Sequence, residues 1–493
     1  MSFDLVLFGG TGDLAWRKLL PALFQAHRHG HLPPGGRIIG GARDDLDDAA
    51  YRTLIASRLA QVEGEKRPSA AEFAEFAQHL HYLRMDLSQP QDYARLAALL
   101  RTREAETAIF YLATAPTLFT TVCEQLGAAG LATANAPVAR VVLEKPLGHD
   151  LASNRAINAA VRAVFDERQI FRIDHYLGKP SVQNLLALRF GNAFFEPLWR
   201  RETVASIEIT LAEQLGVEKR GAFYDSTGAL RDMVQNHALQ LLCAIGMEPP
   251  INAHADAIRD EKLKVLRSLQ PWTPESLAQG VVRGQYVAGP MGGLALPGYQ
   301  SEPGVAAGST TETYVALRTE IANWRWAGVP FFVRTGKRLA AQEAYISVRF
   351  RETPHAIYRT PLGAANRLVI HLQPRDGLAL HLFAAGQSPR LPTAGPPTLA
   401  PVQLNLDFAQ RFGSERVGAY ERLLLDVIDG RLNLFVRSDE QEAAWRWVEP
   451  ILQFWREHDG RGEGPRPYAA GSWGPSAASA LVARSGHSWM EEH

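Results

Sequence analysis

Four chemically active side chains and a glycine fall within six positions of this chain, in the segment Asp174–His175–Tyr176–Leu177–Gly178–Lys179. An aspartate beside a histidine can orient the imidazole or stabilise its charged form. His175, Tyr176 and Lys179 together offer hydrogen-bond donors and positive charge, which suits a dianion such as a phosphate. A polar turn with a solvated lysine would look the same in a sequence, so this segment alone leaves both interpretations open.

A glycine-rich turn near the N-terminus indicates a second kind of chemistry. The turn Gly9–Gly10–Thr11–Gly12–Asp13–Leu14 follows the apolar run Phe3–Phe8 and precedes a helical pattern that reaches Phe24. Between a strand and a helix, such glycines let backbone N–H groups approach a pyrophosphate. The spacing is G-x-x-G and not the full G-x-G-x-x-G, so a turn that serves only tight packing stays an alternative. Pro21 is expected to end or restart the helix.

The end of the next expected strand bears on the choice of coenzyme. Arg37–Gly40 reads as a strand, and Arg43 and Asp44 follow it. In a dinucleotide-binding fold an acid at this point accepts the ribose 2′-hydroxyl of NAD, whereas an arginine pairs with the 2′-phosphate of NADP. Arg43 favours NADP, and Asp44 leaves NAD open.

Strands and helices alternate over the first 174 residues, which predicts a parallel sheet with helices on both faces. The remaining strands of this sheet are expected at His81–Leu87, Ile109–Ala113, Val138–Leu143 and Gln169–Ile173. Ligands bind such sheets beyond the carboxyl ends of the strands. The glycine turn, Arg43, Lys145 and the Asp174–Lys179 segment all lie at such ends, so we expect them to share one site.

The second half of the chain has a different order of predicted elements, because strand patterns follow one another with few helices between them. This predicts a large, mainly antiparallel sheet. Its strands are expected at Val204–Leu211, Thr313–Ile321, Phe331–Arg334, Ala344–Phe350, Arg367–Leu372 and Gly377–Phe383. Gly284–Gly308 is expected to be irregular and the tail from Gly460 loop-like. We therefore predict a dinucleotide-binding domain over residues 1–177 and a substrate-binding, dimerising β+α domain over 178–493.

One histidine of the second half is a candidate general base. His237 lies on the apolar stripe of an expected helix over Leu230–Leu242, four residues from Met233 and from Leu241. A lone histidine there is more often a core residue, but a neighbouring carboxylate would make it a credible base near neutral pH. Asp174 is one candidate carboxylate. Asp232 should not share a helix face with His237 at about 100° per residue.

Composition bounds the class of protein. The chain has 493 residues and equal numbers of basic and acidic side chains, 52 each, so nothing global indicates nucleic acid or an anionic membrane as a partner. Neither a signal peptide nor a run long enough to span a bilayer is visible. The two cysteines, Cys123 and Cys243, form no disulfide framework and suit a reducing, cytoplasmic location.

Taken together, these segments resemble the glucose-6-phosphate dehydrogenase family over essentially the whole chain. The segments that carry the resemblance are Gly9–Ala15, Glu144–Gly148, Arg172–Lys179, Asp232–His237, Gly328–Phe331 with Arg334–Lys337, Tyr420–Arg422 and Gly471–Pro475. The segment over Asp174–Lys179 is nearly diagnostic. Related sugar oxidoreductases share the Glu144–Lys145–Pro146 triplet.

The resemblance implies oxidation at C1 of glucose 6-phosphate, the first step of the oxidative pentose phosphate pathway, with hydride transfer to a nicotinamide. It implies that His237 is the base and that Asp174 orients it. The remaining roles that it implies are a phosphate site of His175, Tyr176 and Lys179, sugar contacts from Glu213, Asp232 and Lys337, Lys145 between coenzyme and sugar, and coenzyme contacts from Thr11, Arg43, Asp86 and Leu87.

The chain departs from the family pattern at Gln342, where many members carry a basic substrate-binding residue, and Asp44 weakens strict NADP specificity. The family is dimeric, so the resemblance implies a homodimer or a dimer of dimers with the large sheet as interface. It implies no metal, and no metal-ligand spacing is visible. Two alternatives stay open: another sugar oxidoreductase with the same triplet, and a coenzyme-binding regulator that kept the fold.

Overall fold

The computed structural model divides the chain into two compact units. The first combines Met1–Lys179 with Pro250–Asp260 and Val417–Glu442, and the second combines Pro180–Pro249 with Glu261–Arg416 and Ala443–His493. The helices α10 (Ala255–Arg267) and α14 (Ser438–His458) each begin in the first unit and end in the second. The structure describes residues 2–62, 64, 67–134, 138–355, 357–358, 365–385, 399–412, 417–459 and 464–490.

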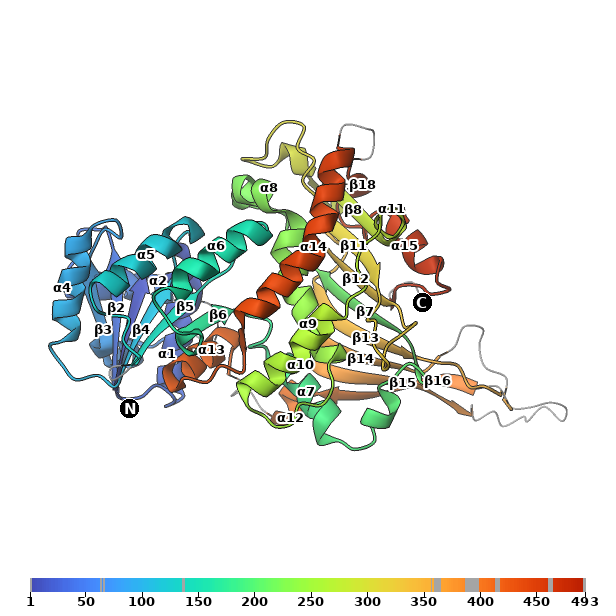
Figure 1. The fold of residues 1–493 in the computed structure, drawn as a ribbon, viewed down its shortest axis with the longest axis horizontal. Helices are drawn as coiled ribbons and strands as arrows, with labels where there is room; N and C mark the ends of the chain where they lie inside the picture. Colours follow the sequence, from blue (N-terminus) through green and yellow to red (C-terminus); the bar gives the residue numbers. More distant parts are fainter. Residues whose placement is uncertain are drawn as a thin grey trace. The chain divides into compact units, whose positions relative to one another are not determined.

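A seven-stranded sheet forms the centre of the first unit (Figure 1). Its strands are β1 (Ser2–Phe8), β2 (Gly35–Ala42), β3 (Leu80–Arg84), β4 (Thr107–Leu112), β5 (Val138–Leu143), β6 (Ile170–Ile173) and β17 (Phe435–Val436). The order is β17-β6-β5-β4-β1-β2-β3, with six parallel strands and β17 antiparallel to β6. The six parallel strands have the order of a doubly wound dinucleotide-binding sheet, which confirms the predicted fold class.

The helices of this unit follow from apolar stripes and local caps. They are η1 (Ala15–Leu19), α1 (Leu20–Arg28), α2 (Asp48–Leu59), α3 (Ala70–Phe76), η3 (Ala77–His79), α4 (Pro90–Leu100), η4 (Pro116–Leu118), α5 (Phe119–Ala128), α6 (Leu151–Arg162), η5 (Glu167–Gln169) and α13 (Ala419–Asp429). Asp47 caps α2 by accepting from the Ala50 N–H, and Asp150 with Ser153 forms a capping box on α6. Side chains of α4, α5 and α6 share one core cluster with Val6 and Phe8.

The glycine turn leads into a helix with two parts. Residues Ala15–Leu19 form a π-helical turn, and α1 begins at Leu20 with Pro21 in its first turn. The Leu20 N–H donates to the Ala15 carbonyl, so the two parts are continuous, and the proline lies where the hydrogen-bond pattern changes from π-helical to α-helical. The type of helix therefore changes just before Pro21, but the chain does not leave the helical conformation there.

A helix from far along the chain belongs to this same unit. Helix α13 packs against α1, η1 and β4. At Gly178, a Cβ atom would lie 2.8 Å from the Ala419 carbonyl oxygen and 3.0 Å from Leu423 Cγ. The glycine thus lets the segment after β6 approach the first turn of α13 closely.

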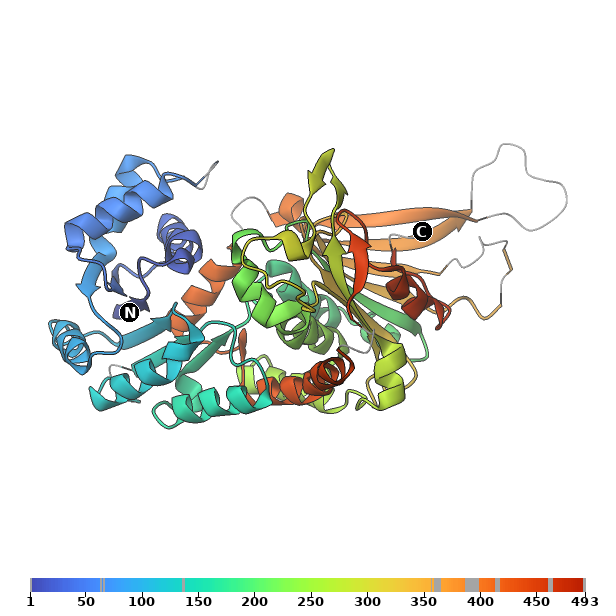
Figure 2. The ribbon, with the colours of Figure 1, turned by 90° about the horizontal axis from the view of Figure 1, so that it is seen from above.

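A nine-stranded sheet dominates the second unit (Figure 2). Its strands are β7 (Val204–Ala212), β8 (Val281–Val287), β11 (Tyr314–Thr319), β12 (Phe331–Gly336), β13 (Glu343–Phe350), β14 (Arg367–Gln373), β15 (Gly377–Ala385), β16 (Leu399–Asp407) and β18 (Arg466–Ala469). The order is β16-β15-β14-β13-β7-β12-β11-β8-β18. Among the described strands of this sheet, only the pairs β7–β12 and β8–β18 are parallel, so the predicted mainly antiparallel sheet is confirmed.

Helices pack on this sheet. They are α7 (Pro180–Gly191), η6 (Glu196–Leu198), η7 (Glu218–Arg220), α8 (Gly221–Ala229), η8 (Leu230–Ala238), α9 (Leu239–Gly246), α11 (Pro274–Gly280), η9 (Tyr299–Ser301), α12 (Phe408–Phe412) and α15 (Ser476–Ala483). The buried carbonyls at the end of α9 accept hydrogen bonds from Arg189 Nη1 at 2.9 Å, Trp199 Nε1 at 2.7 Å and Trp326 Nε1 at 2.7 Å. These donors replace the water that an exposed helix end would bind.

Some expectations for the second half were wrong. The tail contains β18 and α15 where we expected a loop, although residues 460–463 lie outside the described part. Strand β8 extends into the segment expected to be irregular, and a hairpin of β9 (Gly289–Met291) and β10 (Leu294–Leu296) follows it. Strand β16 was not expected at all. Over the described residues, no helix combines the length and the apolar character needed to cross a membrane.

Candidate active site

A cavity of about 560 Å³ lies beyond the carboxyl ends of β1 and β2 in the first unit. Six residues that the sequence analysis singled out for the coenzyme line it: Gly9, Thr11, Gly12, Arg43, Asp86 and Leu87. Asp44, Met85, Ser88, Thr114 and Leu118 are also among its lining residues. Gly10, Asp13, Leu14 and Lys145 are not part of the lining. Asp13 instead forms an ion pair with Arg17 at 2.6 Å.

The glycine turn at this cavity has no room for side chains. A Cβ atom on Gly10 would lie 2.6 Å from the Gly40 Cα, and one on Gly9 would lie 2.7 Å from the Ala113 carbonyl oxygen. The N–H groups of Gly9 and Gly10 both donate to the Gly41 carbonyl, at 2.8 and 3.2 Å. These contacts press the turn onto β2, so glycine serves tight packing as well as open access to the backbone.

The lining also holds a polar atom that needs a partner. Thr114 Oγ1 is buried and has no hydrogen-bond partner among the described residues. A buried hydroxyl without a partner is uncommon, because leaving it unsatisfied costs about 1–3 kcal/mol. Together with the bare glycine turn, this hydroxyl fits a cavity that receives a polar, phosphate-bearing ligand.

The two charged residues after β2 have different surroundings. Thr11 donates from Oγ1 to Asp44 Oδ2 at 2.6 Å, so the Asp44 carboxylate is held by the glycine turn. The Tyr82 hydroxyl donates to the Asp44 carbonyl at 2.7 Å. Hydrogen bonds from Ser88 lower the pKa of Asp86, and the positive charge of Arg43 lowers this pKa further. Asp86 thus stays ionised at one wall of the cavity, in the electrostatic field of Arg43.

The loop after β5 carries a buried carboxylate next to Lys145. The Tyr111 hydroxyl donates to Glu144 Oε1 at 2.5 Å, and Tyr420 of α13 also hydrogen-bonds to Glu144. Burial raises the pKa of Glu144, and these donors together with the charge of Lys145 offset only part of that rise. The Lys145–Pro146 bond is cis. Two tyrosines and a glutamate therefore fix the backbone from which Lys145 projects.

The segment that follows β6 is a tight, mostly buried turn. Asp174 Oδ1 accepts the Tyr176 N–H at 3.0 Å, and the Asp174 carbonyl accepts the Leu177 N–H at 3.0 Å. Lys179 Nζ lies 4.2 Å from the centre of the Tyr176 ring. The His175 ring is stacked with that of Tyr420, with centroids 6.3 Å apart. The turn and the Glu144–Lys145 loop are thus tied together through Tyr420.

Strand register explains how Glu213 and Lys337 meet in the second unit. Strands β7 and β12 are parallel, with Ala212 opposite Gly336, so the residue that follows each strand is adjacent to the other. Lys337 Nζ lies 2.5 Å from Glu213 Oε2. It also lies 5.0 Å from the centre of the Tyr224 ring. Gln342 is exposed and directly precedes β13. The first residue of β13, Glu343, pairs with Ala212, so Gln342 lies at the end of β7 that also carries Glu213.

The segment with Asp232 and His237 is a π-helix, η8, and not the expected α-helix. A π-helix has i→i+5 hydrogen bonds, so residues five apart lie closer in angle than in an α-helix. Our expectation that Asp232 and His237 point apart rested on α-helical geometry and does not apply here. His237 is fully buried, and π-helical turns are frequent at functional sites.

A buried glutamate holds the start of this π-helix. Glu312 Oε1 accepts the Leu230 N–H at 2.9 Å, and burial raises the pKa of Glu312. A Cβ atom on Gly228 would lie 2.4 Å from Glu312 Oε1, and Gly228 has a φ of +74°. Burial also raises the pKa of the neighbouring Tyr224, with the negative charge of Asp232 as the next cause. Neither Glu312 nor Tyr224 lies in a recognisable motif, so neither could be identified from the sequence.

The first unit therefore brings together the cavity, Lys145 and the Asp174–Lys179 turn, and the second brings together Glu213, Lys337, Tyr224 and the π-helix. The first of these groups combines a cavity at the ends of β1, β2, β3 and β4 with a cationic turn at the end of β6, at the same edge of the sheet. The other part offers carboxylates and a lysine for hydroxyl groups, next to a buried imidazole. Asp174 and His237 belong to different units, and their contact stays a prediction.

Two family models match almost the entire chain. The NAD-binding domain of glucose-6-phosphate dehydrogenase matches residues 6–184, and the C-terminal domain of glucose-6-phosphate dehydrogenase matches residues 186–490. The junction between the two matches lies a few residues after the predicted boundary between Leu177 and Gly178.

Similar proteins agree with these matches. The glucose-6-phosphate 1-dehydrogenase of Rhizobium meliloti is 46% identical, with 99% of this chain and 98% of the relative covered. That of Mycolicibacterium smegmatis is 47% identical, with 99% and 97% covered. A solved glucose-6-phosphate dehydrogenase in complex with its substrate glucose-6-phosphate has a TM-score of 0.89 at 32% identity, with 99% of this chain and 98% of that one covered. By these matches and by the fold, the chain belongs to the glucose-6-phosphate dehydrogenase family.

Proposed function

We propose that this protein oxidises the C1 hydroxyl of β-D-glucose 6-phosphate to 6-phosphoglucono-δ-lactone, with NADP⁺ as the hydride acceptor. The observation that carries the proposal is the position of the Asp174–Lys179 turn. It follows β6 at the same edge of the sheet as the cavity, which is lined by residues that follow β1, β2, β3 and β4. A phosphate bound by this turn would hold the sugar next to the coenzyme, as the reaction requires.

The substrate phosphate is assigned to His175, Tyr176 and Lys179. The lysine is already positioned over the Tyr176 ring, so little side-chain freedom is lost when a dianion binds. Phosphate contacts are remote from C1, and their binding energy offsets the cost of orienting C1 for reaction. This division explains why a phosphate-binding turn is needed for chemistry at the opposite end of the sugar.

The proton and the sugar hydroxyls are assigned to the second group of residues. His237 is the general base that takes the O1 proton, and Asp174 orients its ring and stabilises the imidazolium. Glu213, Asp232 and Lys337 bind sugar hydroxyls, and Gln342 provides a neutral contact where a cation is common. Lys145 lies between coenzyme and sugar. A nicotinamide coenzyme supplies an acceptor for the C1 hydride, and Gly9, Thr11, Gly12, Asp86 and Leu87 are the residues that would hold it.

A comparison of three substrates tests this assignment. We expect NADP⁺ reduction with glucose 6-phosphate and a much lower kcat/KM with glucose or with 6-phosphogluconate, and we expect a lactone as the product by NMR. Equal kcat/KM values for glucose and glucose 6-phosphate would contradict the phosphate site. A protein that binds coenzyme but turns over none of the three substrates would be a regulator.

The coenzyme preference is proposed to be NADP, with NAD as a second coenzyme. Asp44 accepts a hydrogen bond from Thr11, so this carboxylate is partly compensated and repels a 2′-phosphate less. Arg43 lines the cavity beside it and supplies the positive charge that a 2′-phosphate needs. The same Asp44 can still accept a ribose 2′-hydroxyl, which allows NAD.

We expect Arg43→Ala to lower kcat/KM for NADP by about 10- to 100-fold and that for NAD by less than about threefold. A hydrogen bond to a charged group is worth about 1.5–3 kcal/mol, and 1.4 kcal/mol corresponds to a factor of ten. Asp44→Ala should have the opposite selectivity. Steady-state kinetics with both coenzymes measures these changes. Arg84→Ala is the matched control, because Arg84 is an exposed arginine paired with Asp45 at 2.9 Å. Equal losses for both coenzymes in Arg43→Ala would contradict the assignment.

The protein is also proposed to form a homodimer, or a dimer of dimers, through the large sheet. Strand β16 ends the strand order. Val402, Leu404 and Leu406 alternate along it and expose 41%, 61% and 44% of their surface. Residues two apart on a strand share one face, so these side chains form an apolar stripe of the kind that contact surfaces bury.

Leu404→Arg should therefore convert the dimer to a monomer at micromolar concentration, because it introduces a charge into an apolar interface. Sedimentation velocity measures the change in mass. Leu294→Arg in the β10 hairpin is the control, since Leu294 is 68% exposed but lies on a different strand pair. An unchanged dimer in Leu404→Arg would show that this stripe is not the interface.

A cytoplasmic location is also proposed, because the two cysteines are buried and free, as is usual in a reducing compartment.

A further inference from the structure

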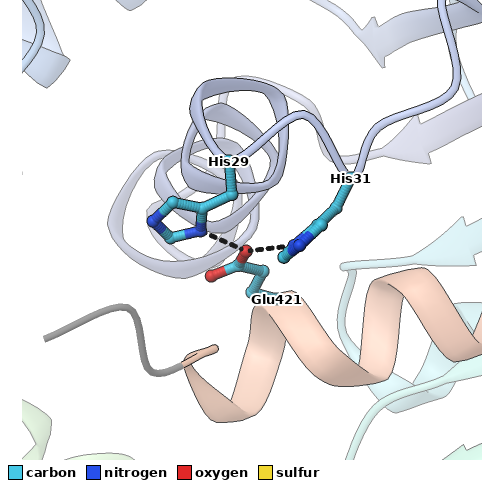
Figure 3. A group of neighbouring side chains, drawn as sticks. All are labelled: His29, His31 and Glu421. Carbon is cyan, nitrogen blue, oxygen red and sulfur yellow. Dashed lines mark hydrogen bonds and ion pairs between the residues drawn. The ribbon is translucent and has the colours of Figure 1, made fainter. Parts of the chain in front are cut away.

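Two histidines and a buried glutamate converge in the first unit, and none of the three belongs to the cavity lining or to the turn described above. His29 follows the end of α1, His31 lies two residues later, and Glu421 belongs to the first turn of α13 (Figure 3). His29 Nδ1 lies 2.8 Å from Glu421 Oε1, and His31 Nδ1 lies 3.6 Å from the same oxygen. One potential ligand atom from each of the three residues lies within 4.8 Å of the others.

Local backbone geometry brings the two imidazoles to the same carboxylate. Gly30 lies between them and has a φ of +69°, a left-handed conformation that commonly ends a helix. The chain turns there, and both rings face Glu421 (Figure 3). The rings are not stacked, since their planes meet at 58°. The Nδ1 atoms of both rings approach the same carboxylate oxygen, Oε1 of Glu421.

These distances are close to those of a tetrahedral zinc site. Zinc binds imidazole nitrogen and carboxylate oxygen at about 2.0–2.2 Å, so neighbouring ligand atoms are separated by roughly 3.3 Å. The two nitrogen–oxygen distances, 2.8 and 3.6 Å, lie on either side of that value. Small side-chain rotations would equalise them. The donor set, two imidazoles and one carboxylate, is the type that zinc and similar divalent metals prefer.

Exposure separates the roles of the three residues. The Glu421 side chain is only 3% exposed, whereas those of His29 and His31 are 25% and 47% exposed. The carboxylate is thus fixed within the protein, and the metal could enter from solvent on the side of His31. Elsewhere in the described ranges, no second group of three such residues converges in this way.

We propose that His29, His31 and Glu421 bind a divalent transition metal, with Zn²⁺ as the reference ion and water in the remaining position. The site would join the end of α1 to the start of α13, two segments 392 positions apart in the sequence. A metal that binds the folded unit and not the unfolded chain stabilises it by mass action. It would also restrain α13, whose Tyr420 stacks on His175.

Zinc titration of the full-length protein without an affinity tag, after dialysis against a chelator, tests the proposal. We expect about one Zn²⁺ per chain, a higher Tm with zinc, and weaker binding as the pH is lowered, because metal ligands must be deprotonated. Co²⁺ in place of Zn²⁺ should give the absorption of a tetrahedral site.

His31→Ala and His29→Ala should each lower zinc affinity by at least about 10- to 100-fold. Loss of an outer-shell partner alone typically has an effect of this size, and loss of a direct ligand should have a larger one. His81→Ala is the matched control, because His81 pairs with a single carboxylate, Asp48, at 2.9 Å. His31→Asn serves if His31→Ala does not fold, as judged by circular dichroism. Zinc affinity that is unchanged in the His29 and His31 variants, or equally reduced in His81→Ala, would overturn the proposal. So would the absence of zinc binding to the wild type.

Discussion

His237→Asn is expected to lower kcat for glucose 6-phosphate oxidation by about two to four orders of magnitude, the usual contribution of a general base. Asparagine fills a similar volume and can still form hydrogen bonds, but it cannot accept the O1 proton. His237 is fully buried in the π-helix η8, so solvent cannot easily replace it as proton acceptor. Steady-state kinetics at saturating coenzyme measures kcat.

Binding measurements separate loss of the base from loss of the site. The Kd of the His237→Asn variant for glucose 6-phosphate should remain within about threefold of the wild-type value, since the phosphate contacts are intact. His487→Asn is the control, because His487 is a partly buried histidine of the same unit that packs against Phe332. A loss in kcat of less than about tenfold in His237→Asn would show that another group takes the proton.

Lys179→Ala is expected to raise the KM for glucose 6-phosphate by about 10- to 150-fold and to leave kcat within about threefold. The lysine would form charge-assisted hydrogen bonds to the phosphate, each worth about 1.5–3 kcal/mol, and 1.4 kcal/mol is a factor of ten. The phosphate is remote from C1, so its loss affects binding more than the chemical step. Steady-state kinetics over a wide range of substrate concentration checks this.

The matched substrate for this prediction is glucose, which has no phosphate. Its low kcat/KM should change little in Lys179→Ala, and Lys179→Arg should restore part of the binding of glucose 6-phosphate. Lys264→Ala is the protein control, because Lys264 is 66% exposed and pairs with Glu261 at 2.7 Å. If the KM in Lys179→Ala is unchanged, Lys179 does not belong to the phosphate site.

The coenzyme-binding half could be predicted from the sequence because its signals are local. The central parallel strands β1 and β4 are buried along almost their whole length and read as mainly apolar runs, and the turns after β1 and β2 carry the glycines and charges. Gly9, Thr11 and Gly12 follow β1 directly, and Arg43 follows β2. The order and connections of strands in such sheets are restricted, so the sequence order of the strands also predicts which strand ends lie near one another.

The contribution of α13 and β17 to the first unit could not be predicted in this way. Tyr420 is more than 240 positions from Lys145 and the Asp174–Lys179 turn, yet it contacts both segments. No spacing pattern in the sequence predicts such a contact. The same holds for Glu421 and the two histidines, which are separated by about 390 positions and meet only in the fold.

The second unit shows two further limits. Lys337 meets Glu213 because β7 and β12 pair in parallel, and the sequence gives no sign of a parallel pair within a mainly antiparallel sheet. The segment Leu230–Ala238 has an α-helical apolar pattern but forms a π-helix. Apolar periodicity cannot distinguish the two over nine residues, so the angle expected between Asp232 and His237 rested on the wrong type of helix.

A crystal structure of His237→Asn with glucose 6-phosphate bound is the most direct test of the proposed site, because this variant should bind substrate and not consume it. We expect the phosphate to contact His175, Tyr176 and Lys179. We expect O1 to lie within about 2.6–3.2 Å of the residue 237 side chain, the reach of a hydrogen bond. A phosphate bound elsewhere, such as at Lys337, or O1 far from residue 237, would contradict the assignment of base and phosphate site.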